Sequence, residues 1–251
     1  MPQHMVNRDR HFPTFCKLVG EENAEHFVTI CNFIGGLLFI AGSICFFPFQ
    51  SVNLFNPGCW LYFCGCVIYF FVGLNDLTEM IQARAHKKVG IYAYEVIAVS
   101  SNLSGTTLYL VGSIFFLSYV GMDLAGGWCF TVGSIALVGG SFMNLLHVYL
   151  LHNPQLLSLQ NFCAVQQLLA AVFFLLPSIW YLPGNFPDQC RELPSGSRWV
   201  ASWQAALYLV GSTLFTTTAM TNLFRSRLFI VFKRIQKDAY PVEADNSMVN
   251  T

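Results

Sequence analysis

Amide and carboxyl side chains recur at fixed spacing inside apolar runs. In the first member of each pair of runs, an asparagine is followed by a small residue after three positions and another after seven more. In the second member, an aspartate or asparagine follows a glycine after eleven positions. Amides and carboxylates at these positions can hydrogen-bond between helices or line a polar path. These candidate residues are Asn32, Asp76, Asn102, Asn144, Asn161 and Asn222.

Two roles are compatible with this repeated pattern. In the first, the side chains fix helix pairing, and we expect Asn32 to meet Asp76, Asn102 to meet Asn144, and Asn161 to meet Asn222, directly or through one water. In the second, the six groups surround a water-filled ion or proton route, with Asp76 as its ionisable member.

Two glutamates share a further repeat position. Glu25 and Glu95 each lie seven residues before the asparagine of their repeat, where the third copy has Pro154. A carboxylate at a helix N-terminus is favoured by the helix dipole, so we expect both glutamates at headgroup level.

The composition indicates a membrane protein. Of the 251 residues, 55% are hydrophobic and only 10% are charged, and the mean hydropathy is +0.52. Six stretches are long enough to cross about 30 Å of hydrocarbon as helices, and their apolar residues do not alternate as barrel strands require. We predict an all-α polytopic integral membrane protein with six transmembrane helices, near residues 27–48, 57–76, 97–119, 125–147, 161–182 and 199–223.

The spans group into three repeated helical hairpins. Residues 1–26 form a cytoplasmic N-terminal arm without the features of a signal peptide, and the repeats occupy 27–82, 97–149 and 161–224. The third repeat has a long outer loop at 183–198, and Pro177 is expected to kink or end its first helix. Residues 225–251 are predicted to be a basic juxtamembrane helix followed by a disordered tail.

Charge asymmetry sets the orientation. Of the 13 Lys and Arg residues, all but Arg191 and Arg198 lie on one side of the predicted spans. The positive-inside rule places that side, with both termini, in the cytoplasm. All five tryptophans fall at the opposite ends of the spans. Basic residues after the sixth span are expected to contact anionic lipid of the bilayer, and they are Arg225, Arg227, Lys233, Arg234 and Lys237.

Several functional classes lack support in the sequence. Neither a nucleophile–base set nor a phosphate-binding loop occurs, so we expect no enzyme and no cofactor. The cysteines and histidines lack metal-ligand spacing, and the zero net charge gives no sign of a nucleic-acid partner. Whether Cys59 and Cys190 form a disulfide is left open, because it depends on whether the fold brings them together.

Short motifs recur in the first two repeats. The first copy carries Asn32-Phe-Ile-Gly-Gly, Gly42-Ser43 and Gly58-Cys-Trp60, and the second carries Gly112-Ser113, Gly127-Trp128 and Gly133-Ser134. These motifs resemble the YrhK-like domain family, a two-helix membrane module. The third, divergent copy keeps Gly211-Ser212. The resemblance implies an integral membrane protein and carries no activity with it.

The sequence therefore favours a non-enzymatic membrane scaffold or assembly component. The alternative is a small channel or transporter with a polar path lined by the repeated Asn and Asp residues. A receptor that binds a ligand through the loop at 183–198 is a third possibility.

Overall fold

A computed structural model describes residues 21–48, 54–83, 89–150, 157–182 and 195–239. The described residues form helices and turns, with no strand among them. The helices are α2 (Glu21–Cys45), α3 (Phe55–Ala83), α4 (Val89–Phe115), α5 (Asp123–Leu150), α6 (Leu157–Ile179) and α7 (Ser195–Ala239). Each predicted span falls within one of these helices or overruns its end by a few residues.

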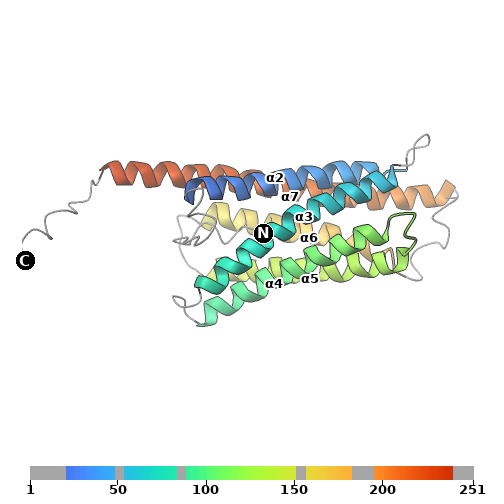
Figure 1. The fold of residues 1–251 in the computed structure, drawn as a ribbon, viewed down its shortest axis with the longest axis horizontal. Helices are drawn as coiled ribbons and strands as arrows, with labels where there is room; N and C mark the ends of the chain where they lie inside the picture. The colour runs from blue at the N-terminus through green and yellow to red at the C-terminus, as the bar shows by residue number, and fades with distance from the viewer. Residues whose placement is uncertain (1–20, 49–53, 84–88, 151–156, 183–194, 240–251) are drawn as a thin grey trace, which may run out of the picture.

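The helix boundaries differ from the predicted ones in three places. Helix α2 begins at Glu21, inside the stretch that the sequence assigns to the N-terminal arm. Helix α7 begins at Ser195, inside the predicted outer loop, and runs unbroken to Ala239. The basic residues from Arg225 onward therefore continue the last helix, whose C-terminal part extends past the bundle (Figure 1). Helix α6 ends two residues after Pro177, as predicted.

The six helices close into a ring. Each helix packs against its neighbours in the sequence, and α7 returns to pack against α2. Figure 1 shows the helices side by side along one long axis. Three antiparallel hairpins, α2–α3, α4–α5 and α6–α7, thus share one interior with no terminal hairpin left unpaired.

Close backbone contact fixes the pairing within each hairpin. A Cβ placed on Gly105 would lie 2.8 Å from the carbonyl oxygen of Gly133, and one on Gly65 would lie 3.3 Å from that of Gly35. Only residues without a large side chain allow helix backbones to approach this closely. The small residues in the sequence pattern therefore lie at the contacts within the hairpins.

The third hairpin repeats this contact with an alanine. A Cβ on Gly211 would lie 3.2 Å from the carbonyl oxygen of Ala170 and 3.1 Å from the ring of Phe174. Gly65 faces Phe39 in the same way, and Gly133 faces Tyr109. The three hairpins are therefore related by a pseudo-threefold repeat around the interior.

Four helices are long and apolar enough to cross a membrane. The qualifying segments are His26–Cys45, Phe55–Thr78, Asp123–His147 and Asn161–Ile179, in α2, α3, α5 and α6. Helices α4 and α7 are richer in hydroxyl residues. Their threonine hydroxyls mostly bond their own helix, as Thr213 does with the Leu209 carbonyl and Thr216 with that of Ser212. Such bonds satisfy the hydroxyl within its own helix.

Candidate functional site in the bundle interior

Hydroxyl groups join the first hairpin to the third in the middle of the bundle. The Ser43 Oγ lies 2.8 Å from the Tyr62 hydroxyl of the same hairpin and 3.0 Å from the Ser212 Oγ on α7. Ser43 also donates to the Phe39 carbonyl in the preceding turn of α2. All three hydroxyl residues are fully buried. This contact closes the helix ring.

The equivalent contact joins the third hairpin to the second. The Ser178 Oγ lies 2.9 Å from the Tyr208 hydroxyl and 3.2 Å from the Ser134 Oγ on α5. The Tyr109 hydroxyl adds a 2.6 Å contact to Ser134. At the remaining junction, between the second and first hairpins, the repeat leads us to expect Ser113 opposite Cys66, a thiol in place of the serine hydroxyl of the other two junctions. Ser113 bonds the Tyr109 carbonyl of its own helix.

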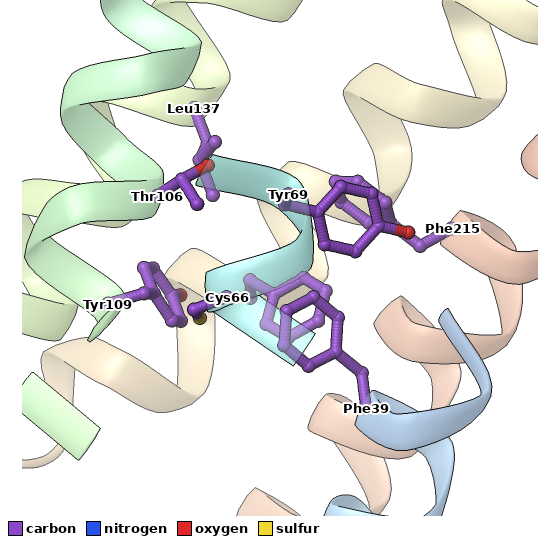
Figure 2. A pocket seen from close by; sticks show the side chains of 8 residues that line it. Phe39, Cys66, Tyr69, Thr106, Tyr109, Leu137 and Phe215 are labelled. Carbon is purple, nitrogen blue, oxygen red and sulfur yellow. The ribbon is translucent and has the colours of Figure 1, made fainter. Parts of the chain in front are cut away.

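Aromatic rings fill the axis of the bundle next to these hydroxyls. Tyr109 stacks on Phe130 at a centroid distance of 4.4 Å, and Phe39 stacks on Tyr69 at 5.4 Å. A cavity of about 20 Å³ lies among these rings, and its volume is near the minimum for one water. Figure 2 shows side chains converging on it from several helices. Its lining residues are Phe39, Cys66, Tyr69, Thr106, Tyr109, Leu137, Phe174 and Phe215.

The predicted amides and Asp76 lie in the half of the bundle that faces the basic side, which is the side where the sequence puts all Lys and Arg except Arg191 and Arg198. Asn32, Asp76, Asn102, Asn144 and Asn222 are each at most 7% exposed. Their side chains therefore face the interior of the bundle. The Asn32 Nδ2 donates to the Val28 carbonyl at 3.0 Å, and its backbone carbonyl accepts a bond from the Tyr69 hydroxyl at 2.8 Å.

The expected direct bond between Asn102 and Asn144 is wrong. The Oδ1 atoms of both residues have no hydrogen-bond partner among the described residues, which rules out an amide–amide bond. Gly105 faces Gly133, Asn102 lies three residues from the first, and Asn144 lies eleven from the second. Asn102 and Asn144 are therefore offset by eight residues, or about 12 Å along the bundle axis at ~1.5 Å per residue.

The same offset applies to the other two predicted pairs. Asn32 lies three residues from Gly35, and Asp76 lies eleven from Gly65. The Asn222 Oδ1 accepts no hydrogen bond from any described residue, so a bond from the Asn161 amide to that oxygen is absent. A link through one water stays a prediction for each pair.

The third repeat has a different register from the one that the sequence suggests. Ala170 is the structural equivalent of Gly35 and Gly105, so Gln167 takes the position of Asn32 and Asn102. Gln167 is 3% exposed, whereas Asn161 is only half-buried. Asn161 therefore lies outside the set of equivalent residues, and Gln167 belongs to it. One sequence feature could have identified Gln167: it lies eleven residues before Ser178, the same separation as between Asn32 and Ser43.

Glu95 lies inside the bundle, in the second turn of α4, and its level in the membrane stays a prediction. Its side chain is 2% exposed, and its Oε1 lies 3.3 Å from the Nε2 of His147 on α5. The sequence analysis did not identify this contact. The signal was present, because His147 lies one turn beyond Asn144 on the same face of the helix. Glu25 lies in α2, and its side chain falls outside the described set.

The remaining sequence predictions concern metals and thiols. Within the described ranges, no cluster of three His, Cys, Asp or Glu side chains could hold a metal ion. Cys59 is buried and carries a free thiol, and Cys190 lies outside the described residues. The basic residues Arg8, Arg10, Lys17, Arg84, Lys87 and Lys88 are also outside them.

Comparison with known proteins finds a similarity for the first two hairpins. The model of the family described as YrhK-like protein matches residues 24–80 and 92–149. Neither a curated protein nor a solved structure matches the chain. The matched segments cover α2 with α3, and α4 with α5, and their boundaries follow the predicted repeats. The two hairpins formed by α2–α3 and α4–α5 are therefore similar to the family described as YrhK-like protein.

Proposed function

We propose that the protein is a six-span integral membrane protein that acts as a non-enzymatic scaffold or assembly component. The distribution of side chains supports insertion of all six helices. Serine hydroxyls are buried in the interior, whereas large apolar side chains cover the outside. Phe71, Trp199 and Met220, for example, are 65%, 67% and 62% exposed. Such a surface requires lipid around it.

Helices α4 and α7 belong to this membrane domain because of their position in the ring. Each packs between two neighbours, at least one of which is apolar enough to span. Their hydroxyl groups are bonded within the helix or turned inward, so their cost in hydrocarbon is small. Six spans also agree with the charge bias, because they put all Lys and Arg residues except Arg191 and Arg198 on one side.

The filled interior is the observation that favours a scaffold over a channel. Aromatic side chains from all six helices occupy the axis, and the described cavity there is only about 20 Å³. A channel needs a continuous wet path. The aromatic side chains along the described axis therefore support a scaffold over a channel, and a closed bundle of this kind is suited to presenting surfaces to lipid and to partner proteins.

The orientation remains the one inferred from charge. Both termini face the cytoplasm, and the C-terminal part of α7 extends beyond the bundle on that side (Figure 1). We propose that the basic residues of this segment contact anionic headgroups where α7 leaves the bilayer, and they are Arg225, Arg227, Lys233, Arg234 and Lys237. Each is worth about 1 kcal/mol of membrane attraction.

Two experiments test this proposal. The first introduces single cysteines in a cysteine-free background at Ser118, between α4 and α5, and at Asn250, then labels intact vesicles with a membrane-impermeant maleimide. Six spans with cytoplasmic termini predict labelling of the two positions from opposite sides. Labelling of both from one side would contradict the six-span topology.

The second experiment measures ion and proton flux in liposomes containing the purified protein. A scaffold predicts flux equal to that of protein-free liposomes. The alternative function, a channel or transporter, is favoured by the buried amides and Asp76 on the basic side of the aromatic layer. Flux that is present in the wild type and lost in Asp76→Ala would establish that alternative.

A further inference from the structure

Two of the three junctions between hairpins are bridged by hydroxyl groups in the same way. In each, a serine on the first helix of one hairpin contacts a tyrosine of its own hairpin and a serine of another hairpin. The two sets are Ser43 with Tyr62 and Ser212, and Ser178 with Tyr208 and Ser134. Buried hydroxyls that satisfy one another in this way hold neighbouring hairpins together.

The third junction, between α3 and α4, has other residue types at both partner positions. In the repeat, Phe130 stands where the two tyrosines do, three residues before a glycine, and Cys66 stands at the position of the second serine. Phenylalanine has no hydroxyl, and a thiol is a weak hydrogen-bond donor and acceptor. Ser113, the remaining serine of the set, donates to the Tyr109 carbonyl of its own helix. The residues that make the hydroxyl bridge elsewhere are therefore replaced here.

A packing defect lies beside the same junction. Four of the eight residues around the cavity of about 20 Å³ come from α3 and α4, and they are Cys66, Tyr69, Thr106 and Tyr109. Figure 2 shows Cys66 next to Tyr109 at this cavity. Leu137 also lines it, at the repeat position where the other hairpins have the larger rings of Tyr69 and Phe215. Atoms that line a void lose packing contacts, so this part of the interior is held less tightly.

Polar contacts hold α3 to the second hairpin at the end opposite the basic side. The Asn56 Nδ2 donates to the Ser118 Oγ at 2.7 Å, and the Ser118 backbone N–H donates to the Asn56 Oδ1 at 3.0 Å. Nearer the basic side, a Cβ on Gly73 would lie 3.1 Å from the Leu103 Cδ1, which is an apolar contact. Apolar contacts between helices add little in a membrane, because lipid tails are equally apolar. The Asn56–Ser118 pair is thus the firm point of this junction.

We propose that the junction between α3 and α4 at the level of Cys66 is a seam at which the helix ring opens, with the Asn56–Ser118 pair as its hinge. Opening separates the first two hairpins at this level. It lets small apolar molecules from the surroundings of the bundle reach the central cavity and the Cys66 thiol. The seam requires only the closed helix ring, so its test is independent of the scaffold role.

Thiol labelling of the full-length wild-type protein in detergent tests the seam. N-ethylmaleimide is small and uncharged, and peptide mass spectrometry gives its rate of reaction at each cysteine. Cys59 and Cys163 are internal controls, because both are at most 2% exposed, as Cys66 is. Cys59 lies one turn from the hinge residue Asn56, and Cys163 lies on α6. We expect Cys66 to react at least about tenfold faster than either, because local opening is more frequent than global unfolding.

Two variants restore the missing hydroxyls. Phe130→Tyr supplies the tyrosine of the other junctions and should slow the labelling of Cys66 about fivefold, because Ser113 gains a buried hydrogen-bond partner. Cys66→Ser supplies the serine and should raise the Tm for the same reason. Phe142→Tyr is the matched control on α5. It adds a hydroxyl to a side chain that is 46% exposed and should leave the labelling rate of Cys66 unchanged.

Two results would overturn the proposal. The first is a Cys66 labelling rate in the wild type that equals those of Cys59 and Cys163, which would mean that reagent reaches the thiol only when the whole bundle unfolds. The second is a folded Phe130→Tyr protein in which Cys66 reacts at the wild-type rate. If Phe130→Tyr does not fold, an unchanged or lower Tm in Cys66→Ser takes its place as the contradicting result.

Discussion

The Ser43 hydroxyl on α2 lies 3.0 Å from the Ser212 hydroxyl on α7, across 169 residues of sequence. This contact and its counterpart, Ser178 with Ser134, follow the same rule. A serine near the C-terminal end of the first helix in a hairpin meets the residue that follows a glycine in the second helix of another hairpin. Two of the three junctions between hairpins thus use one repeated contact.

Removing the closing hydroxyl should destabilise the bundle. We expect Ser212→Ala to cost about 1 kcal/mol of unfolding free energy, because Ser43 and Tyr62 lose a buried hydrogen-bond partner. Chemical unfolding in detergent measures the change. The matched control is Thr213→Ala on the adjacent residue, whose hydroxyl is exposed and bonds only its own helix. Equal effects in the two variants would contradict a closing role for Ser212.

Glycines at the helix contacts should reject even a methyl group. We expect Gly105→Ala to lower the unfolding free energy by about 1–3 kcal/mol, because the added Cβ would meet the Gly133 carbonyl oxygen at 2.8 Å. Gly139→Ala is the matched control. It lies in α5 with nothing within 4 Å of its Cβ position, so helix propensity should make it neutral or stabilising by up to ~1 kcal/mol.

The contact between Glu95 and His147 should behave as a coupled pair. His147→Ala leaves a carboxylate buried without its imidazole, which we expect to cost about 3 kcal/mol. Glu95→Gln should cost less. The double variant should be more stable than the sum of the single effects implies, and a double-mutant cycle of unfolding free energies measures the difference. Additive effects would show that the two groups do not interact.

The register of the third hairpin can be tested with two alanine variants. Gln167→Ala removes a fully buried amide, and Asn161→Ala removes a half-buried one. We expect the first to lower the Tm more than the second, because truncation leaves a larger void and unmatched polar neighbours in the interior. A larger effect at Asn161 would favour the register that the sequence suggests.

Sequence patterns predicted the helices and the contacts within hairpins well, because both depend on local features. Long apolar runs fix the helices, and Gly65 and Gly133 mark backbone contacts that only small residues permit. The pattern failed at Asn161 because Ala164 and Ala171 follow it at the same spacing as the true repeat. An alanine can substitute for glycine, so spacing alone could not separate two registers six residues apart.

The interior contacts were less accessible to prediction. The expected pairs of amides assumed equal depth, whereas the antiparallel pairing at Gly105 and Gly133 offsets Asn102 from Asn144 by eight residues. Contact between Ser43 and Ser212 depends on how three hairpins pack together, which no local pattern contains. Glu95 was expected at a helix N-terminus, whereas its contact with His147 depends on how α4 packs against α5.

Contact between α2 and α7 also bears on the order of the hairpins along the chain. The start of α2 and the end of the bundled part of α7 lie on the same side, so a linker could join them. A rearranged gene that begins with α4 and ends with α3 would preserve every contact described within and between the hairpins. The contacts of the assembled ring therefore do not depend on which helix comes first in the chain.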